Sequence, residues 1–293
     1  MGFPALNGKT RVCGLFGYPV EHSFSPAMHN AAFEALNTNW VYVPFSVAPD
    51  RLSQAVKGIT SLGLAGVNVT VPHKQAVVPL LDEVHPTAKI IGAVNTIVNC
   101  NGRLTGHNTD GSGFVRALSD EVHFSPKGKS ALIVGAGGAA RAVALQLSLT
   151  GLTSVYITNR SREKAEALAR DINTATNTRA VMLPWGDELP GDKVAEVSLV
   201  VQTTPIGMAP NVKQCPDFPF DAITPGQVIC DLIYNPGQTT FLKRAAASGA
   251  VTLNGLGMLL YQGVLAFELW TGLAAPVKVM REALLKQVSK AEE

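Results

Sequence analysis

Four short stretches of the sequence concentrate polar and ionisable side chains at the edges of apolar segments. They are HSFSPAMHN at 22–30, VNVTVPHK at 67–74, GAVNTIVN at 92–99 and GHNTDGSG at 106–113. Hydroxyl and amide groups can hydrogen-bond a polar small molecule, and an ammonium such as that of Lys74 can donate a proton or stabilise negative charge. The four stretches therefore indicate a binding site for a polar small molecule.

The stretch VNVTVPHK suggests how a strand presents such groups. Three valines alternate with Asn68 and Thr70, so we expect the valines to face one side of a sheet and the polar pair the other. Pro72 lacks an N–H group and is expected to end the ladder of hydrogen bonds. Lys74 is then predicted to lie just beyond the end of the strand.

A glycine-rich turn follows the apolar strand 131–134 and precedes a helical pattern. It fits the dinucleotide-binding motif G-x-G-x-x-[GA] in the context that the motif requires. Gly135 permits a tight turn, Gly137 lets the backbone approach a pyrophosphate, and Ala140 allows the helix to pack closely on the strand. The alternative is a turn that binds nothing. The predicted phosphate-binding residues are Gly135, Ala136, Gly137, Gly138 and Ala139.

The residues after the second strand of this unit predict which dinucleotide binds. NAD sites place an acidic residue here to accept hydrogen bonds from the adenosine ribose, and the sequence has Asn159 and Arg160 instead. A guanidinium suits the 2′-phosphate of NADP, since its planar fork binds phosphate oxygens bidentately. Ser161 and Lys164 are predicted to join this site. The alternative is that Ser161 only caps the following helix while the basic residues are solvated.

The elements that position these residues form two units. In the first, strands at 11–18, 40–47 and 65–72 alternate with helices at 25–36 and 50–62, which is typical of a mostly parallel sheet. Asn101 and Gly102 then indicate a two-residue hairpin, and a helix is expected from about 111 to 121. Serine and proline at 25 and 26 are expected to cap and start the first helix.

The second unit has six apolar strands, which fits a doubly wound, Rossmann-like sheet. Helical segments end the chain and are expected to return to the first unit. The predicted fold is therefore α/β with two domains. We predict a substrate-binding catalytic domain at 1–110, an NADP-binding domain at 111–256, and helices at 257–293 that pack on the first domain.

Taken in order along the chain, these motifs resemble the shikimate dehydrogenase family. The four polar stretches agree with GAGGAAR, NRSREKA, TTPIGM, DLIYNP and GLGMLLYQG, so that the resemblance runs from about Gly14 to the final helices. It implies reversible reduction of 3-dehydroshikimate to shikimate by NADPH, a step toward chorismate and the aromatic amino acids. It also implies that Lys74 is the catalytic lysine and Asp110 its partner.

The resemblance assigns the remaining site residues. Ser23 and Ser25 would hold the substrate carboxylate, and the residues implied near the rest of the substrate are Thr70, Asn95, Asp110, Gln262 and Tyr234. Leu232 and Gly255 are implied around the nicotinamide, with Met258 in the same loop, and Thr204 and Met208 are implied as further cofactor contacts. Gln202 departs from the family pattern, which often begins with asparagine, and is doubtful as a cofactor contact. Taken alone, Lys74 could be a solvated lysine, Asp110 a helix cap, and Gln262 a buried amide bonded to a carbonyl.

Composition limits the other functions. The 293 residues are 46% apolar and 16% charged, and 24 basic against 22 acidic residues give a net charge of +2. No nucleic-acid or membrane partner is expected, and the absence of a signal-like N-terminus predicts the cytoplasm. The four cysteines and six histidines show no metal-ligand spacing, so no metal is expected. A monomer or homodimer is expected. The rivals are an NAD-preferring quinate/shikimate dehydrogenase and a non-catalytic NADP-binding sensor.

Overall fold

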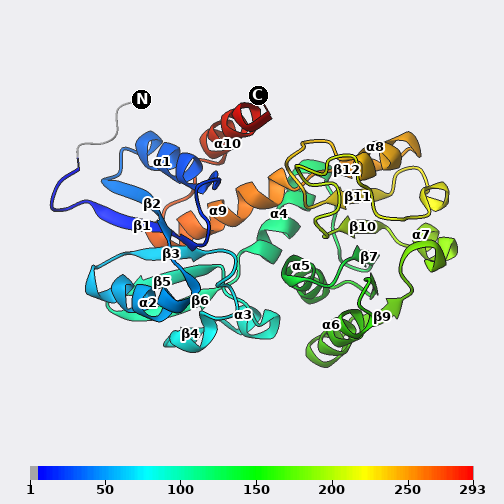
Figure 1. Ribbon diagram of the computed structural model, residues 1–293, viewed down its shortest axis with the longest axis horizontal. Coiled ribbons are helices and arrows are strands. Elements are labelled where there is room, and N and C mark those ends of the chain that lie inside the picture. Colours follow the sequence, from blue (N-terminus) through cyan, green and yellow to red (C-terminus); the bar gives the residue numbers. More distant parts are fainter. Residues whose placement is uncertain (1–5, 293) are drawn as a thin grey trace. The chain divides into compact units, whose positions relative to one another are not determined.

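The computed structural model describes residues 6–292 and contains two compact units, each built on a six-stranded sheet (Figure 1). One unit comprises the residues up to Thr109 together with those from Gln262 onward, and the other comprises Asp110–Tyr261. The predicted α/β fold class is confirmed. The predicted domain roles and boundaries at 110 and 256 stay a prediction.

The first unit contains both ends of the chain. Its strands are β1 (Arg11–Gly17), β2 (Trp40–Ser46), β3 (Gly66–Val69), β4 (Glu83–Val84), β5 (Thr96–Cys100) and β6 (Arg103–His107). Its helices are α1 (Ser25–Ala35), α2 (Leu52–Ser61), α3 (Pro86–Ile91), most of α9 (Leu256–Thr271) and α10 (Val277–Glu292). The strand order is β2-β1-β3-β5-β6-β4. Strands β1, β2 and β3 run parallel, whereas β5 is antiparallel to both β3 and β6.

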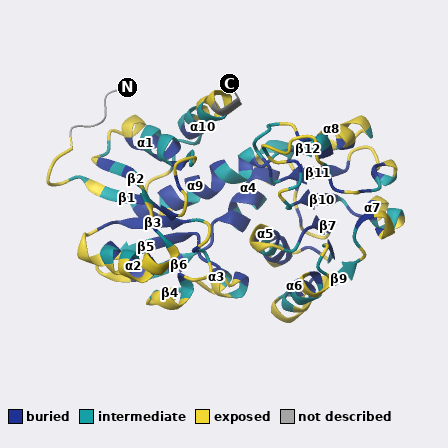
Figure 2. Cartoon of the chain, viewed as in Figure 1, coloured by how far each residue is buried: buried dark blue, intermediate teal, exposed yellow. Residues whose placement is uncertain are grey.

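The turn between β5 and β6 is the predicted two-residue hairpin. Asn101 and Gly102 have φ values of 53° and 90°, which is the left-handed conformation that such turns require. Helix α2 covers the sheet with an apolar face made by Leu52, Val56 and Ile59, which are spaced at helical intervals and buried. Figure 2 shows this pattern, with largely buried strands and a helix exposed along one side.

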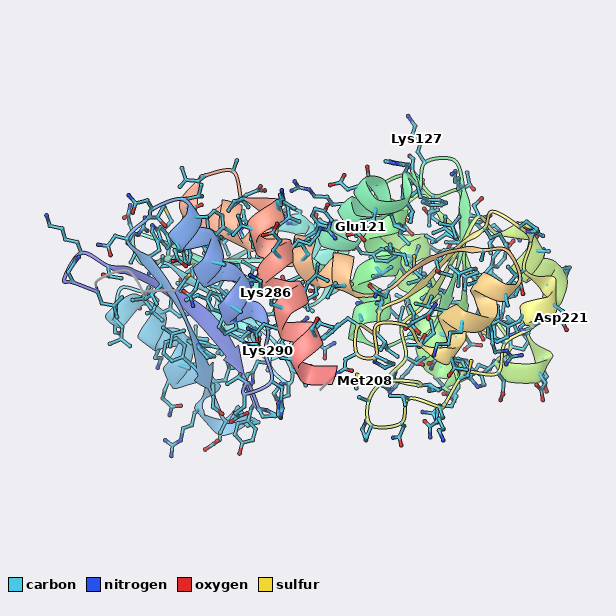
Figure 3. All side chains as sticks on the ribbon, turned by 90° about the horizontal axis from the view of Figure 1, so that it is seen from above. Glu121, Lys127, Met208, Asp221, Lys286 and Lys290 are labelled. Atoms are coloured by element: carbon cyan, nitrogen blue, oxygen red, sulfur yellow. The ribbon has the colours of Figure 1, made fainter. Side chains whose placement is uncertain are left out.

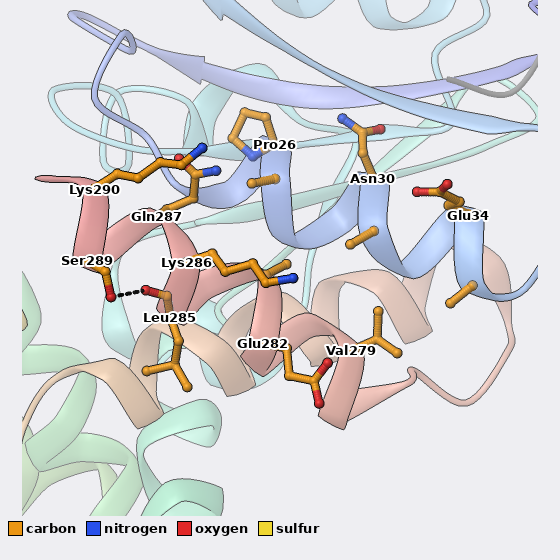
Figure 4. A pocket seen from close by; sticks show the side chains of 14 residues that line it. Pro26, Asn30, Glu34, Val279, Glu282, Leu285, Lys286, Gln287, Ser289 and Lys290 are labelled. Carbon is orange, nitrogen blue, oxygen red and sulfur yellow. Dashed lines mark hydrogen bonds between the residues drawn. The ribbon is translucent and has the colours of Figure 1, made fainter. Parts of the chain in front are cut away.

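Helices α1 and α10 pack against one another in the first unit and border a groove of about 830 Å³ (Figure 4). Ala27 and Ala31 of α1 and Ala283 of α10 line it with small apolar side chains. Lys286 and Lys290 of α10 lie toward one end of the groove, beside the start of α1 (Figure 4).

The second unit is a doubly wound parallel sheet. Its strands are β7 (Ser130–Val134), β8 (Ser154–Thr158), β9 (Arg179–Leu183), β10 (Leu199–Gln202), β11 (Val228–Asp231) and β12 (Val251–Leu253). Its helices are α4 (Asp110–Val122), α5 (Gly138–Leu149), α6 (Arg162–Ala175), α7 (Gly191–Glu196), α8 (Thr240–Ala247) and the start of α9. The order β12-β11-β10-β7-β8-β9, parallel throughout, confirms the six predicted strands.

The central strands of this second sheet are apolar on both faces because helices cover both sides. The four residues of β10 and the four of β11 are all buried, and residues 131–134 of β7 are buried as well. Apart from Gln202 and Asp231, the last residues of β10 and β11, these residues form the continuous apolar runs that a fully covered parallel strand requires. Their carboxyl ends are the places where a doubly wound sheet binds its ligands.

One predicted feature of the first sheet is wrong. Val67 and Val69 are buried as expected, but Val71 is 68% exposed. Strand β3 ends at Val69, and the chain turns where Pro72 interrupts the backbone hydrogen bonding, so the alternation no longer applies at Val71.

Within residues 6–292, no helix has the length and apolar character needed to cross a membrane.

Candidate active site

Two of the predicted anion-binding residues lie at the first turn of α1. The hydroxyl of Ser23 accepts a hydrogen bond of 3.3 Å from the backbone N–H of Ser25. The N-cap position is Phe24, so the prediction that Ser25 caps the helix is wrong. Ser25 is instead the first helical residue, since the Ser23 hydroxyl already satisfies its N–H group. Both hydroxyls therefore belong to a helix N-terminus, where the backbone favours negative charge.

A tight turn after β3 determines where Lys74 lies. The carbonyl of Thr70 accepts a hydrogen bond from the N–H of His73, and the carbonyl of Lys74 accepts one from the N–H of Val94. Thr70 and Lys74 are partly buried. His73 is buried, with its Nε2 atom 2.7 Å from the carbonyl of Val47. This contact anchors the turn that precedes Lys74.

The predicted amide Asn95 belongs to a buried hydrogen-bond network. Its Oδ1 accepts from the backbone N–H of Thr109 at 2.7 Å, and its Nδ2 donates to the Thr109 hydroxyl at 3.0 Å. The hydroxyl of Thr96 donates to Asn95 and accepts from Asn68. Tyr42 donates its phenol proton to Asn68 at 2.9 Å. The network fixes the orientation of the Asn95 amide, because its members are buried and hydrogen-bonded to one another.

Asp110 belongs to the second unit and Gln262 to the first. Asp110 is the first residue of α4 and is 8% exposed, and it follows Thr109 directly in the chain. Gln262 lies within α9 and is 9% exposed. Both are therefore buried polar residues, which was expected from the sequence for Gln262 only.

The glycine-rich turn after β7 has the backbone that a dinucleotide site needs. Gly135 has a φ of 119°, and a Cβ atom there would collide with the hydroxyl of Thr203. Apart from its own stretch of backbone, no atom of residues 6–292 lies within 4 Å of a Cβ built at Gly137 or Gly138, so the backbone at the start of α5 is open to a ligand. Ala140 is fully buried, as the close packing of helix on strand requires. These residues fit a pyrophosphate at the helix N-terminus.

The predicted ribose end of that site follows β8. Ser161 is the N-cap of α6 and accepts a hydrogen bond from the N–H of Lys164 at 3.5 Å. The Nδ2 atom of Asn159 donates to the carbonyl of Ser161 at 2.9 Å and so shapes the turn. Arg160 and Lys164 are exposed. Ser161 does cap the helix, and binding of a phosphate by these residues stays a prediction.

The remaining residues predicted to contact the cofactor, and Tyr234, come from three neighbouring segments of the second unit. Met208, after β10, is 47% exposed (Figure 3). A Cβ atom at Gly255 would collide with the carbonyl of Leu232, so only glycine lets these two backbone segments approach so closely. Burial raises the pKa of Tyr234 above its ordinary value, which keeps the phenol protonated. Thr204 and Met258 are partly buried.

The sequence did not indicate a role for Tyr42 and left that of Gln202 doubtful, yet both side chains make buried hydrogen bonds. Tyr42 gave no sequence signal, since its partner Asn68 lies on another strand. The side chain of Gln202, doubtful as a cofactor contact, is fully buried and bonded within the protein. Among residues 6–292, no three His, Cys, Asp or Glu side chains are grouped to hold a metal ion.

Models of protein families match three parts of the chain. The shikimate dehydrogenase substrate-binding domain matches residues 15–97, the shikimate/quinate 5-dehydrogenase family matches 118–189, and the shikimate 5′-dehydrogenase C-terminal domain matches 255–285.

Individual proteins match over nearly the whole length. The NADP(+) shikimate dehydrogenase of Desulforamulus reducens is 67% identical over 290 residues, covering 99% of this chain and 100% of the relative. The shikimate 5-dehydrogenase of Thermus thermophilus, solved with NADP(H) and shikimate, has a TM-score of 0.84 at 38% identity and covers 95% of this chain and 100% of its own. The quinate dehydrogenase of Corynebacterium glutamicum, solved with NAD, has a TM-score of 0.86 at 36% identity. That match covers 94% of this chain and 99% of the quinate dehydrogenase chain.

Proposed function

The chain belongs to the shikimate dehydrogenase family, and we propose that it catalyses the reversible, NADP-dependent reduction of 3-dehydroshikimate to shikimate. The observation that carries the proposal is the 67% identity, over nearly the full length of both chains, with an NADP(+) shikimate dehydrogenase. The presence of Lys74, Asp110 and an open dinucleotide turn in the same chain supports it.

The polar groups of the first unit suit a hydroxylated carboxylic acid. Ser23 and Ser25, at the N-terminus of α1, would bind the substrate carboxylate, since hydroxyls and helix dipole both favour an anion there. Thr70, Asn95 and Gln262 would bind the ring hydroxyls. Asn95 is suited to this role because the buried network holds its amide in one orientation, which reduces the entropy lost on binding.

Lys74 would supply the proton. Reduction of a ketone leaves negative charge on its oxygen, and an ammonium beside that oxygen both stabilises the charge and donates the proton that forms the alcohol. In the oxidative direction the neutral amine would take the proton back. Asp110 is the second proposed catalytic residue, and a carboxylate favours the charged form of an ammonium close to it. Tyr234, which burial keeps protonated, would donate a hydrogen bond near the substrate.

The dinucleotide would bind along the second unit. NADPH supplies the hydride when it is bound. Gly137 and Gly138 would hold its pyrophosphate at the start of α5, and Arg160 would bind the 2′-phosphate with Ser161 and Lys164 nearby. The residues of the second unit that would surround the nicotinamide are Thr204, Met208, Leu232, Gly255 and Met258.

A second candidate is an NAD-preferring quinate dehydrogenase. The likeness to the quinate dehydrogenase of Corynebacterium glutamicum favours it. Arg160, at a position where an NAD site places an acidic residue, supports NADP instead. A non-catalytic NADP-binding sensor would require an idle Lys74 or Asp110, and both residues are present. The cytoplasmic location and the monomeric or homodimeric state stay predictions.

The proposal is tested by mixing the purified chain with NADPH and 3-dehydroshikimate and following the loss of NADPH absorbance. We expect turnover, with shikimate as the product by chromatography. Tight binding of NADPH and shikimate without turnover would support the sensor and contradict the proposed enzyme.

A further inference from the structure

Two buried polar side chains join the ends of β10 and β11. Gln202 is the last residue of β10 and Asp231 the last residue of β11, and they are paired in the parallel register. Both are fully buried. They therefore lie at the carboxyl edge of the sheet, immediately before the loops 203–208 and 232–239.

The carboxylate of Asp231 organises the loop that follows β11. One oxygen accepts hydrogen bonds from the N–H of Ile233 at 3.0 Å and from Nε2 of Gln202 at 3.4 Å. The other accepts from the hydroxyl of Thr239 at 2.7 Å. The same Thr239 hydroxyl caps α8 by accepting from the N–H of Leu242 at 3.3 Å. Asp231 thus joins the beginning of the loop to the helix at its end.

The amide of Gln202 organises the loop that follows β10. Its Nε2 atom donates to the carbonyls of Thr204 at 3.0 Å and Ile206 at 3.3 Å, and its Oε1 accepts from the N–H of Thr204. The bond between Gln202 and Asp231 connects this loop to the other. The hydrogen bonds of this side chain go to its own loop and to Asp231. Its burial agrees with the doubt about Gln202 as a cofactor contact.

The charge of Asp231 is expensive to bury. Within the described part of the chain, all of its hydrogen-bond donors are neutral and no cation pairs with it. Burial raises its pKa to about 6. A buried carboxylate with no cation beside it lowers the free energy of unfolding. Asp231 therefore fits a role in shaping the adjoining loops rather than in stabilising the protein.

We propose that Gln202 and Asp231 are a positioning pair that fixes the loops 203–208 and 232–239 to receive the nicotinamide half of the dinucleotide. The inference rests on the proposed function, because that function assigns Thr204 and Leu232, in these loops, to the nicotinamide. Neither member of the pair touches the dinucleotide itself. The pair acts through the backbone geometry of the two loops.

A matched control is available at the opposite end of β11. Gln227 is also a buried glutamine whose Nε2 donates to the carbonyls of Val194 at 2.7 Å and Val197 at 2.6 Å. Its Oε1 accepts from the N–H of Thr224 at 2.7 Å. Gln227→Leu therefore removes a comparable set of buried hydrogen bonds just before the amino end of β11, the strand that pairs with β10. Any effect common to Gln202→Leu and Gln227→Leu is structural.

The test compares the affinities of the wild-type chain and both variants for NADPH and for 2′,5′-ADP, which has no nicotinamide, by titration calorimetry. For Gln202→Leu we expect NADPH to bind at least roughly tenfold more weakly and 2′,5′-ADP to bind as in wild type, since the loss of a buried hydrogen-bonded group is of this order. Gln227→Leu should bind both as wild type does. Equal effects of the two variants, or equal weakening of both ligands by Gln202→Leu, would overturn the inference.

A second pair of variants decides the matter even if Gln202→Leu does not fold. Thr239→Ser keeps the hydroxyl that donates to Asp231, whereas Thr239→Val removes it without changing the size of the side chain. We expect Thr239→Ser to keep wild-type NADPH affinity and Thr239→Val to lose roughly tenfold, again with 2′,5′-ADP unaffected. Equal affinities for NADPH would overturn the inference. These measurements need no turnover, so their failure is distinct from the failure of the proposed reaction.

Discussion

Lys74 is the residue whose proposed role is most easily separated from substrate binding. It follows a turn that His73 anchors, and its own carbonyl is bonded to the N–H of Val94, so a shorter side chain leaves the backbone in place. For Lys74→Ala we expect turnover to fall by about 10²- to 10⁴-fold, the usual contribution of a general acid or base, while shikimate still binds.

The measurement is kcat from steady-state kinetics together with shikimate affinity from calorimetry. The matched control is Lys89→Ala, which removes an exposed lysine from α3 and should leave both values unchanged. Turnover of Lys74→Ala within about twofold of wild type would rule out acid-base catalysis by this lysine.

Arg160 is predicted to select NADPH by its guanidinium. It is exposed after β8, beside a turn that Asn159 and Ser161 shape, so its removal costs little stability. For Arg160→Ala we expect kcat/KM with NADPH to fall about 10- to 100-fold and that with NADH to change little, because a hydrogen bond between charged groups contributes about 1.5–3 kcal/mol. Arg170→Ala, in the exposed part of α6, is the control. An equal loss with both dinucleotides would contradict selection by Arg160.

At the scale of elements, two glycines should respond oppositely to alanine. Gly255→Ala puts a methyl group into the carbonyl of Leu232 and forces the backbone apart, so we expect stability to fall by about 1–3 kcal/mol or more. Gly58→Ala lies inside α2 with its nearest neighbour 3.9 Å away, so we expect a gain of about 0.5–1 kcal/mol. Urea unfolding of both variants measures the difference. A Gly255→Ala variant as stable as wild type would show that the two segments do not need this close approach.

Most elements could be predicted because local patterns determine them. The glycine turn after β7 and the hairpin at Asn101 require backbone conformations that only a few residue types adopt readily. The exposure of Val71 was not predicted, because the sequence was expected to keep the strand going to Pro72 whereas β3 ends at Val69. The same holds for Ser25, whose place in the helix depends on the hydroxyl of Ser23 two residues earlier.

The supporting residues of the site were beyond prediction for a related reason. Tyr42 reaches Asn68 across the sheet from a position 26 residues earlier, so neither residue identifies the other in the sequence. Gln202 and Asp231 are 29 residues apart and meet only because β10 and β11 pair in parallel register. Residues that would touch the ligand follow recognisable motifs, whereas residues that orient them are defined by tertiary contacts.

At the scale of the whole molecule, His29 couples folding to pH. It is fully buried, its ring nitrogens have no hydrogen-bond partner among residues 6–292, and it stacks on Tyr42 with ring centroids 4.4 Å apart. Burial lowers its pKa from 6.5 to about 3. The folded state therefore binds fewer protons than the unfolded state between these values, so the stability present above pH 6.5 is lost as the pH falls toward 3.

The prediction compares wild type with His29→Phe, which keeps an aromatic ring but cannot be protonated. Between about pH 7 and pH 4 the wild type should lose about 3 kcal/mol more than the variant, because its unfolded state gains a proton that its folded state excludes. The opposing contribution of Asp231, which both chains retain, cancels in the comparison. Urea unfolding at the two pH values measures the loss of unfolding free energy for each protein. If wild type and His29→Phe lose the same amount, His29 is not held neutral in the folded state.

The reaction itself is tested most directly by comparing kcat/KM for shikimate and quinate, each with NADP and with NAD. We predict the highest value for shikimate with NADP, exceeding that for shikimate with NAD by about tenfold or more, which corresponds to about 1.4 kcal/mol of discrimination. The guanidinium of Arg160 would supply this discrimination through the 2′-phosphate. A preference for NAD of about tenfold, or a higher value for quinate than for shikimate, would contradict the proposed function.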